Sequence, residues 1–184
     1  MKTDKELKVI QAAHDVFFRY GFARTTMGDL AKEAGLSRPA LYLVYPGKAE
    51  VFQAVVEWMI DTMLDTIVST LKPDWSLERR LTHVLETSVC KAYDEVKAHP
   101  DAQDLLSLDG QMPGLEHAYE KLHRCLADQL DDTVKASGST ATADEIARTL
   151  MSAVRGFKLV AIDGADLRKL IALQVALVSA ALQK

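Results

Sequence analysis

The side chains whose chemistry points to a binding function lie between Thr25 and Lys48. A short helix predicted in this segment buries its small and aliphatic residues and leaves Arg38, Tyr42 and Tyr45 facing outward. The guanidinium of Arg38 can donate two hydrogen bonds to O6 and N7 of a guanine, which makes it a candidate for reading a base. Arg38, Tyr42 and Tyr45 are therefore candidates for contact with a nucleic acid.

Two short helices joined by a tight turn are predicted to position these side chains. Thr26 and Asp29 form a capping-box pattern at the start of the first helix. Gly35 suits the left-handed conformation that follows a helix end. Ser37 can cap the second helix, and Pro39 lies in its first turn, where a missing N–H costs little. This is the outline of a helix-turn-helix, in which one helix braces the next against a DNA groove.

The segment from Val9 to Phe52 resembles the N-terminal domain of the TetR family of bacterial transcriptional regulators. It departs from the family at Leu43-Val44-Tyr45, where a second Tyr, then His or Asn, then Phe is common, and at Gly47, where Ser or Asn is common. The resemblance implies an all-α fold with a three-helix DNA-binding head and a six-helix body. The residues that carry the resemblance are Ala12-Ala13, Phe17, Gly21-Phe22, Thr25-Thr26, Asp29, Ala31, Ala34-Gly35, Ser37, Leu41-Tyr42, Pro46 and Lys48.

The same resemblance implies which residues contact DNA. Thr26 and Tyr42 match positions that usually touch phosphate, and Lys48 matches a basic position at the start of the fourth helix. Tyr45 has two open interpretations, a phosphate contact or packing under Pro46. The predicted DNA-binding residues are Thr26, Ser37, Arg38, Pro39, Ala40, Tyr42, Tyr45 and Lys48, and the four from Ser37 to Ala40 match positions that face base edges.

Charge is distributed unevenly along the chain, although its net value is −4. The first 50 residues hold eight basic and six acidic residues, whereas the rest holds 14 basic and 20 acidic. Between Arg19 and Lys48 there are five basic residues against two acidic ones. A mildly basic head on an acidic body can bind phosphates locally, so the overall negative charge does not exclude DNA as a partner.

The sequence beyond the head predicts helices and no strand. A DNA-binding domain is expected at 1–47 and a ligand-binding and dimerisation domain at 48–184, with a long linking helix at about 48–71. The first helix is expected to run through Tyr20. Further helices are expected from Ser76 to about His99, at 102–108, from about 115 to 134, from Thr142 to about Ile162, and to the end of the chain. With the head, this makes nine helices.

The last two predicted helices are too apolar to be covered by one chain. Eleven of the 13 residues from Leu170 to Leu182 are apolar, which leaves the final helix without a polar face. The resemblance implies that these helices of two subunits form a four-helix bundle; a central helix buried in a monomer is the alternative. The predicted dimer-interface residues are Ile146, Leu150, Val154, Phe157, Leu170, Leu173, Leu177, Val178 and Ala181.

Methionine and aromatic side chains in the body suit a cavity for a small hydrophobic ligand, and they suit an ordinary core equally well. The predicted ligand-binding residues are Trp58, Met59, Met63, Tyr93, Leu105, Met112, Tyr119, Met151 and Phe157. The sequence thus favours a homodimeric regulator, most simply a repressor released from a palindromic DNA operator by a hydrophobic effector. An effector-independent regulator, or a helical carrier or enzyme with a vestigial head, is the alternative.

Several other classes of protein are disfavoured by the sequence. The five histidines have no i, i+4 pairing, and no glycine-rich phosphate loop or nucleophile motif is present, so we expect no enzyme activity, metal or cofactor. Cys90 and Cys125 do not form a C-x-x-C pair, and the N-terminus does not resemble a targeting segment, which favours the cytoplasm. The most apolar stretch is too short to span a bilayer, so no membrane partner is expected.

Overall fold

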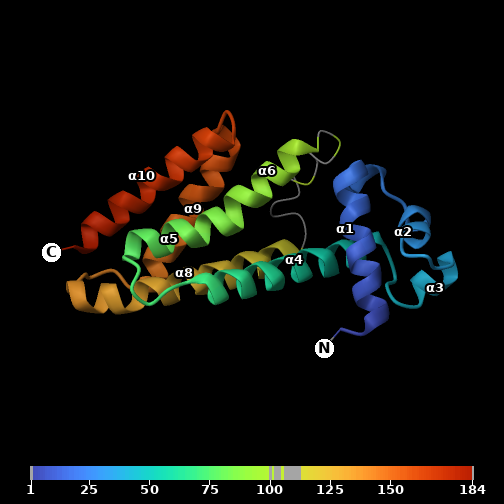
Figure 1. The fold of residues 1–184 in the computed structure, drawn as a ribbon, viewed down its shortest axis with the longest axis horizontal. Helices are drawn as coiled ribbons and strands as arrows, with labels where there is room; N and C mark the ends of the chain where they lie inside the picture. Colours follow the sequence, from blue (N-terminus) through green and yellow to red (C-terminus); the bar gives the residue numbers. More distant parts are fainter. Residues whose placement is uncertain (1, 100, 102–104, 106–112, 184) are drawn as a thin grey trace. The chain divides into compact units, whose positions relative to one another are not determined.

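The computed structural model describes residues 2–99, 101, 105 and 113–183 (Figure 1). These residues form helices and no strand, which confirms the all-α prediction. The short helix predicted at 102–108 lies outside the described residues except at Leu105. The elements are α1 (Asp4–Arg24), α2 (Met27–Glu33), α3 (Arg38–Tyr42), α4 (Lys48–Thr70), α5 (Leu77–Leu85), the π-helical turn η1 (Glu86–Cys90), α6 (Lys91–Ala98), α8 (Pro113–Ser137), α9 (Ala143–Val160) and α10 (Gly164–Leu182).

The chain divides into two compact units, each with its own hydrophobic core. The head unit comprises Met1–Asp61 and Glu95–Ala118, and the body unit comprises Thr62–Asp94 and Tyr119–Lys184. Helix α4 therefore contributes residues 48–61 to the head and residues 62–70 to the body. It has 23 residues, a length of about 35 Å, and its bounds agree with the predicted linking helix. The functional division at 47/48 stays a prediction.

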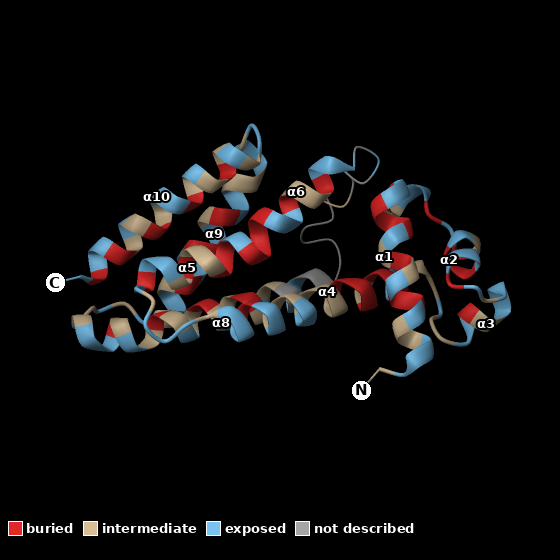
Figure 2. Ribbon diagram, viewed as in Figure 1, coloured by how far each residue is buried: buried red, intermediate tan, exposed pale blue. Residues whose placement is uncertain are grey.

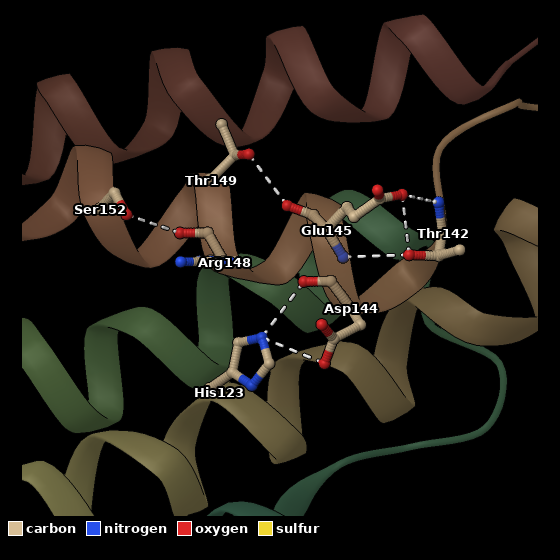
Figure 3. A network of polar contacts seen from close by, with 7 residues as sticks. All are labelled: His123, Thr142, Asp144, Glu145, Arg148, Thr149 and Ser152. Atoms are coloured by element: carbon tan, nitrogen blue, oxygen red, sulfur yellow. Dashed lines mark hydrogen bonds and ion pairs between the residues drawn. The ribbon is translucent and has the colours of Figure 1, made fainter.

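Helix starts follow the local capping signals of the sequence. Thr3 and Thr26 each accept a hydrogen bond from the backbone N–H three residues later, and the acidic side chain at that position binds back. Thr142 forms the third such capping box, with Glu145 at the start of α9 (Figure 3). Ser76 caps α5 by accepting from the Arg79 N–H at 3.2 Å. Each cap satisfies backbone donors that the first helical turn leaves without partners.

Helix α1 breaks where the sequence places Gly21. The helix predicted through Tyr20 is regular to that point, and Gly21 then adopts φ 77° and ψ 167°, a conformation open mainly to glycine. One further helical turn follows to Arg24. The break turns the chain toward α2, and Gly21 itself is buried.

The helix predicted from Ser76 to about His99 contains a π-helical turn that the sequence pattern did not indicate. The chain runs through α5, η1 and α6 from Leu77 to Ala98. In a π-helical turn such as η1 the backbone hydrogen bonds join residues five apart, instead of four apart as in an α-helix. Four consecutive residues, Thr87 to Cys90, are buried there, more than one face of an α-helix would cover. The Ser88 hydroxyl donates to the Val84 carbonyl oxygen at 2.6 Å, which satisfies one polar group inside the core.

Buried residues line the facing sides of the body helices (Figure 2). The body core joins residues of α4, α5, η1, α6, α8, α9 and α10, and its fully buried members include Leu81, Leu126, Leu150 and Leu167. Among the described residues, none of the helices combines the length and hydropathy needed to cross a membrane.

Candidate nucleic-acid interface

Helix α2 begins at a capping box that also sets the ionisation of its acidic residue. The Asp29 carboxylate accepts hydrogen bonds from the Thr26 hydroxyl at 2.6 Å and from the Thr26 backbone N–H at 2.9 Å. These bonds favour the charged form and lower the pKa of Asp29. Thr26 is exposed, as the phosphate-contact prediction requires, and its hydroxyl proton is directed to Asp29.

The turn between α2 and α3 is a Schellman motif centred on Gly35. The Leu36 N–H donates to the Ala31 carbonyl oxygen at 2.8 Å, and the Gly35 N–H donates to that of Lys32 at 3.1 Å. Gly35 has φ +64°, the left-handed conformation expected from the sequence. Ser37 then caps α3 by accepting from the Ala40 N–H at 3.3 Å. The predicted helix-turn-helix is therefore built from local bonds.

Helix α3 presents most of the predicted base-facing residues to solvent. Ser37, Arg38 and Pro39 are exposed and Ala40 is half-buried, while Leu41 is fully buried beneath them. The Arg38 guanidinium carbon lies 5.8 Å from the centre of the Tyr42 ring, a cation–π contact that restrains the arginine one turn away. Tyr42 is 43% exposed. Arg38 and Tyr42 thus share one accessible surface.

Tyr45 packs against the head core as well as facing solvent. It is half-buried among residues that contact the head cluster, and this burial raises the pKa of its phenol. This is packing against the head core, and the predicted packing under Pro46 stays a prediction. A phosphate contact through the phenol oxygen stays a prediction.

Lys48 is engaged inside the head. Its Nζ donates to the Phe22 carbonyl oxygen at 2.7 Å and to the Ala23 carbonyl oxygen at 3.3 Å. It also lies 4.4 Å from the centre of the Phe22 ring. The ammonium thereby joins the last turn of α1 to the first residue of α4, a role that sequence reasoning missed. Its charge still lies at the N-terminus of α4, where a phosphate would be attracted.

Leu43, which is not among the predicted DNA-binding residues, is the most exposed of the large hydrophobic side chains described in the head. It is 86% exposed at the C-cap of α3, compared with 43% for Tyr42. Its backbone N–H donates to the Pro39 carbonyl oxygen at 3.2 Å, so Leu43 continues the helix one turn beyond Pro39. That i, i+4 spacing is visible in the sequence and places the two residues on one face.

The predicted ligand-binding residues are divided between the two cores. Trp58, Met59 and Leu105 pack with the head core, and Met112 lies outside the described residues. Met63, Tyr93, Tyr119, Met151 and Phe157 pack with the body core. A shared ligand cavity therefore stays a prediction.

Two of these aromatic residues make polar contacts that tie helices of the body together. The Tyr93 hydroxyl donates to the Ala161 carbonyl oxygen at 3.3 Å. Lys158 Nζ donates to the Tyr119 hydroxyl oxygen at 2.6 Å, and the Arg155 guanidinium lies 3.8 Å from the centre of the same ring. Tyr119 thus has a cationic environment, unlike the apolar one that the sequence pattern suggested.

The predicted dimer-interface residues fall into buried and exposed groups. Leu150 and Val154 are 0% and 1% exposed within a single chain, so they belong to the subunit core and their inclusion in the interface was wrong. Both are members of the body core, together with residues of α8 and α10. Ile146, Phe157 and Val178 pack partly against the same core, and Leu170 is half-buried. Leu173, Leu177 and Ala181 are exposed.

Further exposed apolar residues, which sequence reasoning missed, lie at the end of α9 and directly after it. Leu159, Val160 and Ile162 are 84%, 70% and 87% exposed. At the start of α9, His123 Nε2 lies 3.1 Å from the Asp144 carbonyl oxygen and 3.5 Å from its carboxylate (Figure 3). The end of α9 therefore carries exposed apolar side chains in addition to the polar contacts of Arg155 and Lys158 with Tyr119.

Comparison with known proteins supports the assignment of the head. Residues 9–55 match the model of a family described as bacterial regulatory proteins, tetR family. Over 74 residues the chain is 32% identical to the nucleoid occlusion factor SlmA of Haemophilus influenzae, covering 40% of this chain and 34% of that protein. Over 55 residues it is 40% identical to the HTH-type transcriptional regulator TtgR of Pseudomonas putida, covering 30% and 26%. The matched part spans about a third of these relatives or less.

Solved structures share the fold over nearly the whole chain. A transcriptional regulator from Rhodococcus superposes with a TM-score of 0.71 at 20% identity, covering 96% of each chain. Thermus thermophilus FadR, described as a transcriptional repressor in complex with lauroyl-CoA, superposes with a TM-score of 0.66 at 21% identity, covering 94% of this chain and 92% of that one. At these identities the likeness establishes the fold, including that of the body.

Proposed function

Because the head of this chain belongs to the tetR family of bacterial regulatory proteins, we propose that the protein is a sequence-specific DNA-binding transcriptional regulator of the cytoplasm. The observation that carries the proposal is the exposure of Ser37, Arg38 and Tyr42 on a helix that local bonds hold in position. A guanidinium can read guanine while neighbouring hydroxyls and the charge at Lys48 bind phosphate. The protein acts most simply as a repressor.

The regulator binds a palindromic operator as a homodimer. Leu173 and Leu177 are 61% and 58% exposed on α10, an apolar surface that a second copy would cover. Two heads related by a two-fold axis match two half-sites about 34–36 Å apart. The exposed face of α10, and not Leu150 or Val154, supports this part of the proposal.

A small hydrophobic effector releases the operator. Support comes from α4, which carries Lys48 in the head at its first residue and Met63 and Ile67 in the body core in its second half. A ligand bound in the body that favours another position of α4 would change the spacing of the two heads. The ligand can shift the equilibrium between the DNA-binding and the released state only by its difference in affinity for the two states. This coupling free energy is typically about 1–3 kcal/mol.

Selection of DNA from a random-sequence pool by the purified full chain tests the proposed function. The expected result is one enriched palindrome. If each head neutralises about three or four phosphates, log K against log salt should have a slope of roughly −5 to −7. Equal affinity for every duplex, or a slope near zero, would contradict the proposal.

A pair of arginine variants supplies the matched control. Arg38→Ala should abolish the preference at one base position per half-site. Arg79→Ala removes the same type of side chain from the body, where it lies 4.3 Å from the centre of the Trp75 ring, and should leave the selected sequence unchanged. Effector binding is tested separately, since hydrophobic compounds should raise the melting temperature and weaken operator binding together. Stabilisation without loss of operator affinity would exclude this coupling.

A further inference from the structure

Leu43 occupies a position that the folding of the head does not explain. It lies two residues after Leu41, which is fully buried, yet it is itself 86% exposed. It is absent from the residues that pack against the head core, whereas its neighbour Tyr45 is among them. A polar residue at this C-cap would leave the described core contacts of α3 unchanged.

The placement of Leu43 continues the surface that is expected to face bases. Its N–H donates to the Pro39 carbonyl oxygen, so the two side chains follow one another on one side of α3. Arg38 and Tyr42 lie on the adjoining side, joined by their cation–π contact. The exposed surface of α3 therefore has a hydrogen-bonding side and an apolar side, and the apolar side is formed by Pro39 and Leu43.

We infer that Leu43 is a specificity-determining residue that packs against the 5-methyl group of a thymine in each half-site. The inference rests on the proposed function, which places α3 in the major groove. Base edges in that groove present nitrogen and oxygen donors and acceptors, and the thymine methyl is the apolar group among them. A leucine cannot donate or accept a hydrogen bond, so this methyl is the complementary partner.

The register along the helix limits which thymine is read. Leu43 follows Arg38 by five residues, a rise of about 7.5 Å along α3. With a spacing of about 3.4 Å per base pair, the thymine lies roughly two base pairs from the base that Arg38 contacts. The same helix would thus read a guanine at one end and a thymine methyl at the other.

Replacing thymine by deoxyuridine tests the inference, because it removes the methyl group and keeps the base-pairing edge. The full chain is titrated against its selected operator with each thymine replaced in turn. At one position per half-site, loss of the methyl should weaken wild-type binding about four-fold, as expected for one buried methyl group, and about 15-fold when both half-sites are changed. For Leu43→Ala the same replacement should change binding by less than about 1.5-fold.

Two further variants separate this contact from a general loss of binding. Leu43→Met keeps a large apolar side chain and should keep the sensitivity to the methyl group. Val68→Ala truncates another exposed apolar side chain, 68% exposed on the body half of α4, and should behave as wild type. Because Leu43 is exposed, Leu43→Ala should also retain the wild-type circular dichroism and melting temperature.

The failures of the two proposals give different results. A protein that selects an operator but responds to no thymine methyl, or whose Leu43→Ala variant responds as strongly as wild type, contradicts this inference alone. Loss of Leu43 that weakens every DNA sequence equally also overturns it, since it indicates a backbone contact. A protein that selects no DNA sequence contradicts the proposed function and, with it, the role of Leu43.

Discussion

Two corners between consecutive helices, one in each unit, are built in different ways. The α2–α3 corner in the head is held by the Schellman bonds around Gly35 and by the Ser37 cap. The α9–α10 corner in the body also has a local cap, in which the Asp163 carboxylate accepts from the Asp166 N–H at 2.8 Å. The bonds that distinguish the second corner come from α6, at a distance of about 70 residues in the sequence.

Tyr93 and Asp94 on α6 provide these distant contacts. The Tyr93 hydroxyl binds the Ala161 carbonyl oxygen, and the Asp94 carboxylate pairs with the Arg168 guanidinium at 2.5 Å. A Cβ atom on Gly164 would clash with Asp94 Oδ1, so the absence of a side chain there makes room for the carboxylate. The hydrogen bonds described at the head corner are all local, whereas the body corner also depends on the position of a third helix.

The largest expected effects come from the leucines that each pair of helices buries. Leu41→Ala and Leu150→Ala should each lower the free energy of unfolding by about 2–5 kcal/mol, because both side chains are fully buried. Leu43→Ala and Leu159→Ala are the exposed counterparts, at 86% and 84% exposure, and should change it by less than about 0.5 kcal/mol. Urea unfolding measures all four. Equal losses for the buried and exposed members of a pair would contradict the burial described here.

Leu177→Arg tests the use of the exposed side of α10. Light scattering should show a monomer, and specific DNA binding should be lost with the dimer while the helical circular dichroism is kept. The introduced charge would otherwise be buried against an apolar partner at a cost of several kcal/mol. A variant that stays dimeric and binds the operator normally would place the interface elsewhere on the chain.

Gly35→Ala should break the head corner locally. A side chain at φ +64° costs about 1–2 kcal/mol, so the variant should be less stable and should bind DNA more weakly. Gly28→Ala is the control in the same motif, because it is helical and its Cβ would meet the Thr26 Oγ at an ordinary 3.4 Å. Denaturant unfolding should show a free energy of unfolding up to about 1 kcal/mol higher for Gly28→Ala than for the wild type. A higher free energy of unfolding for Gly35→Ala would contradict the role assigned to the turn.

A substitution on α6 should change how a substitution in the α9–α10 corner affects the stability of the protein. Asp94→Ala should cost less than about 1 kcal/mol, because the Asp94 and Arg168 side chains are 44% and 39% exposed. Gly164→Ala should give no gain in wild type, where its Cβ displaces the carboxylate, but should stabilise the Asp94→Ala protein by up to about 1 kcal/mol. Thermal unfolding of the wild type, the two single variants and the double variant measures whether the effect of Gly164→Ala on stability depends on Asp94.

Gly156→Ala is the control for the comparison of Gly164→Ala with and without Asp94. No atom lies within 4 Å of the Cβ that this substitution would add to α9, so it should stabilise both backgrounds equally. If Gly164→Ala has the same effect with and without Asp94, the contact between α6 and this corner does not influence stability.

The smallest expected effects concern two capping boxes, one in each unit. Hydrogen bonds from Thr26 and Thr142 lower the pKa values of Asp29 and Glu145. Because the folded pKa is below the ordinary one, this stabilisation is present above about pH 4 and is lost as the pH falls through the lowered pKa. Thr26→Ala and Thr142→Ala remove the hydroxyl bond and keep the backbone N–H bond, so NMR titration should show each pKa rising only part of the way toward 3.8 and 4.5. An unchanged pKa in either variant would show that the hydroxyl bond does not contribute to lowering it.

The amino-acid sequence by itself determined the elements that depend on contacts within a few residues. The predicted caps Thr26 and Ser37, the left-handed Gly35 and the start of a helix at Thr142 are confirmed, as are the bounds of α4 to within one residue. The resemblance of the head to its family followed from the same short motif. These features can be predicted because each hydrogen bond joins groups whose separation along the chain fixes their separation in space.

Only the tertiary structure decided how those elements use their remaining side chains. It placed Lys48 against the end of α1, divided the predicted ligand residues between two cores, and buried Leu150 within the subunit. Helical periodicity shows that a face is apolar but not which neighbour covers it, since the covering residues come from distant parts of the chain. The pairing of Asp94 with Arg168, 74 residues later, has no local signal because it exists only once α6 and α10 have packed together.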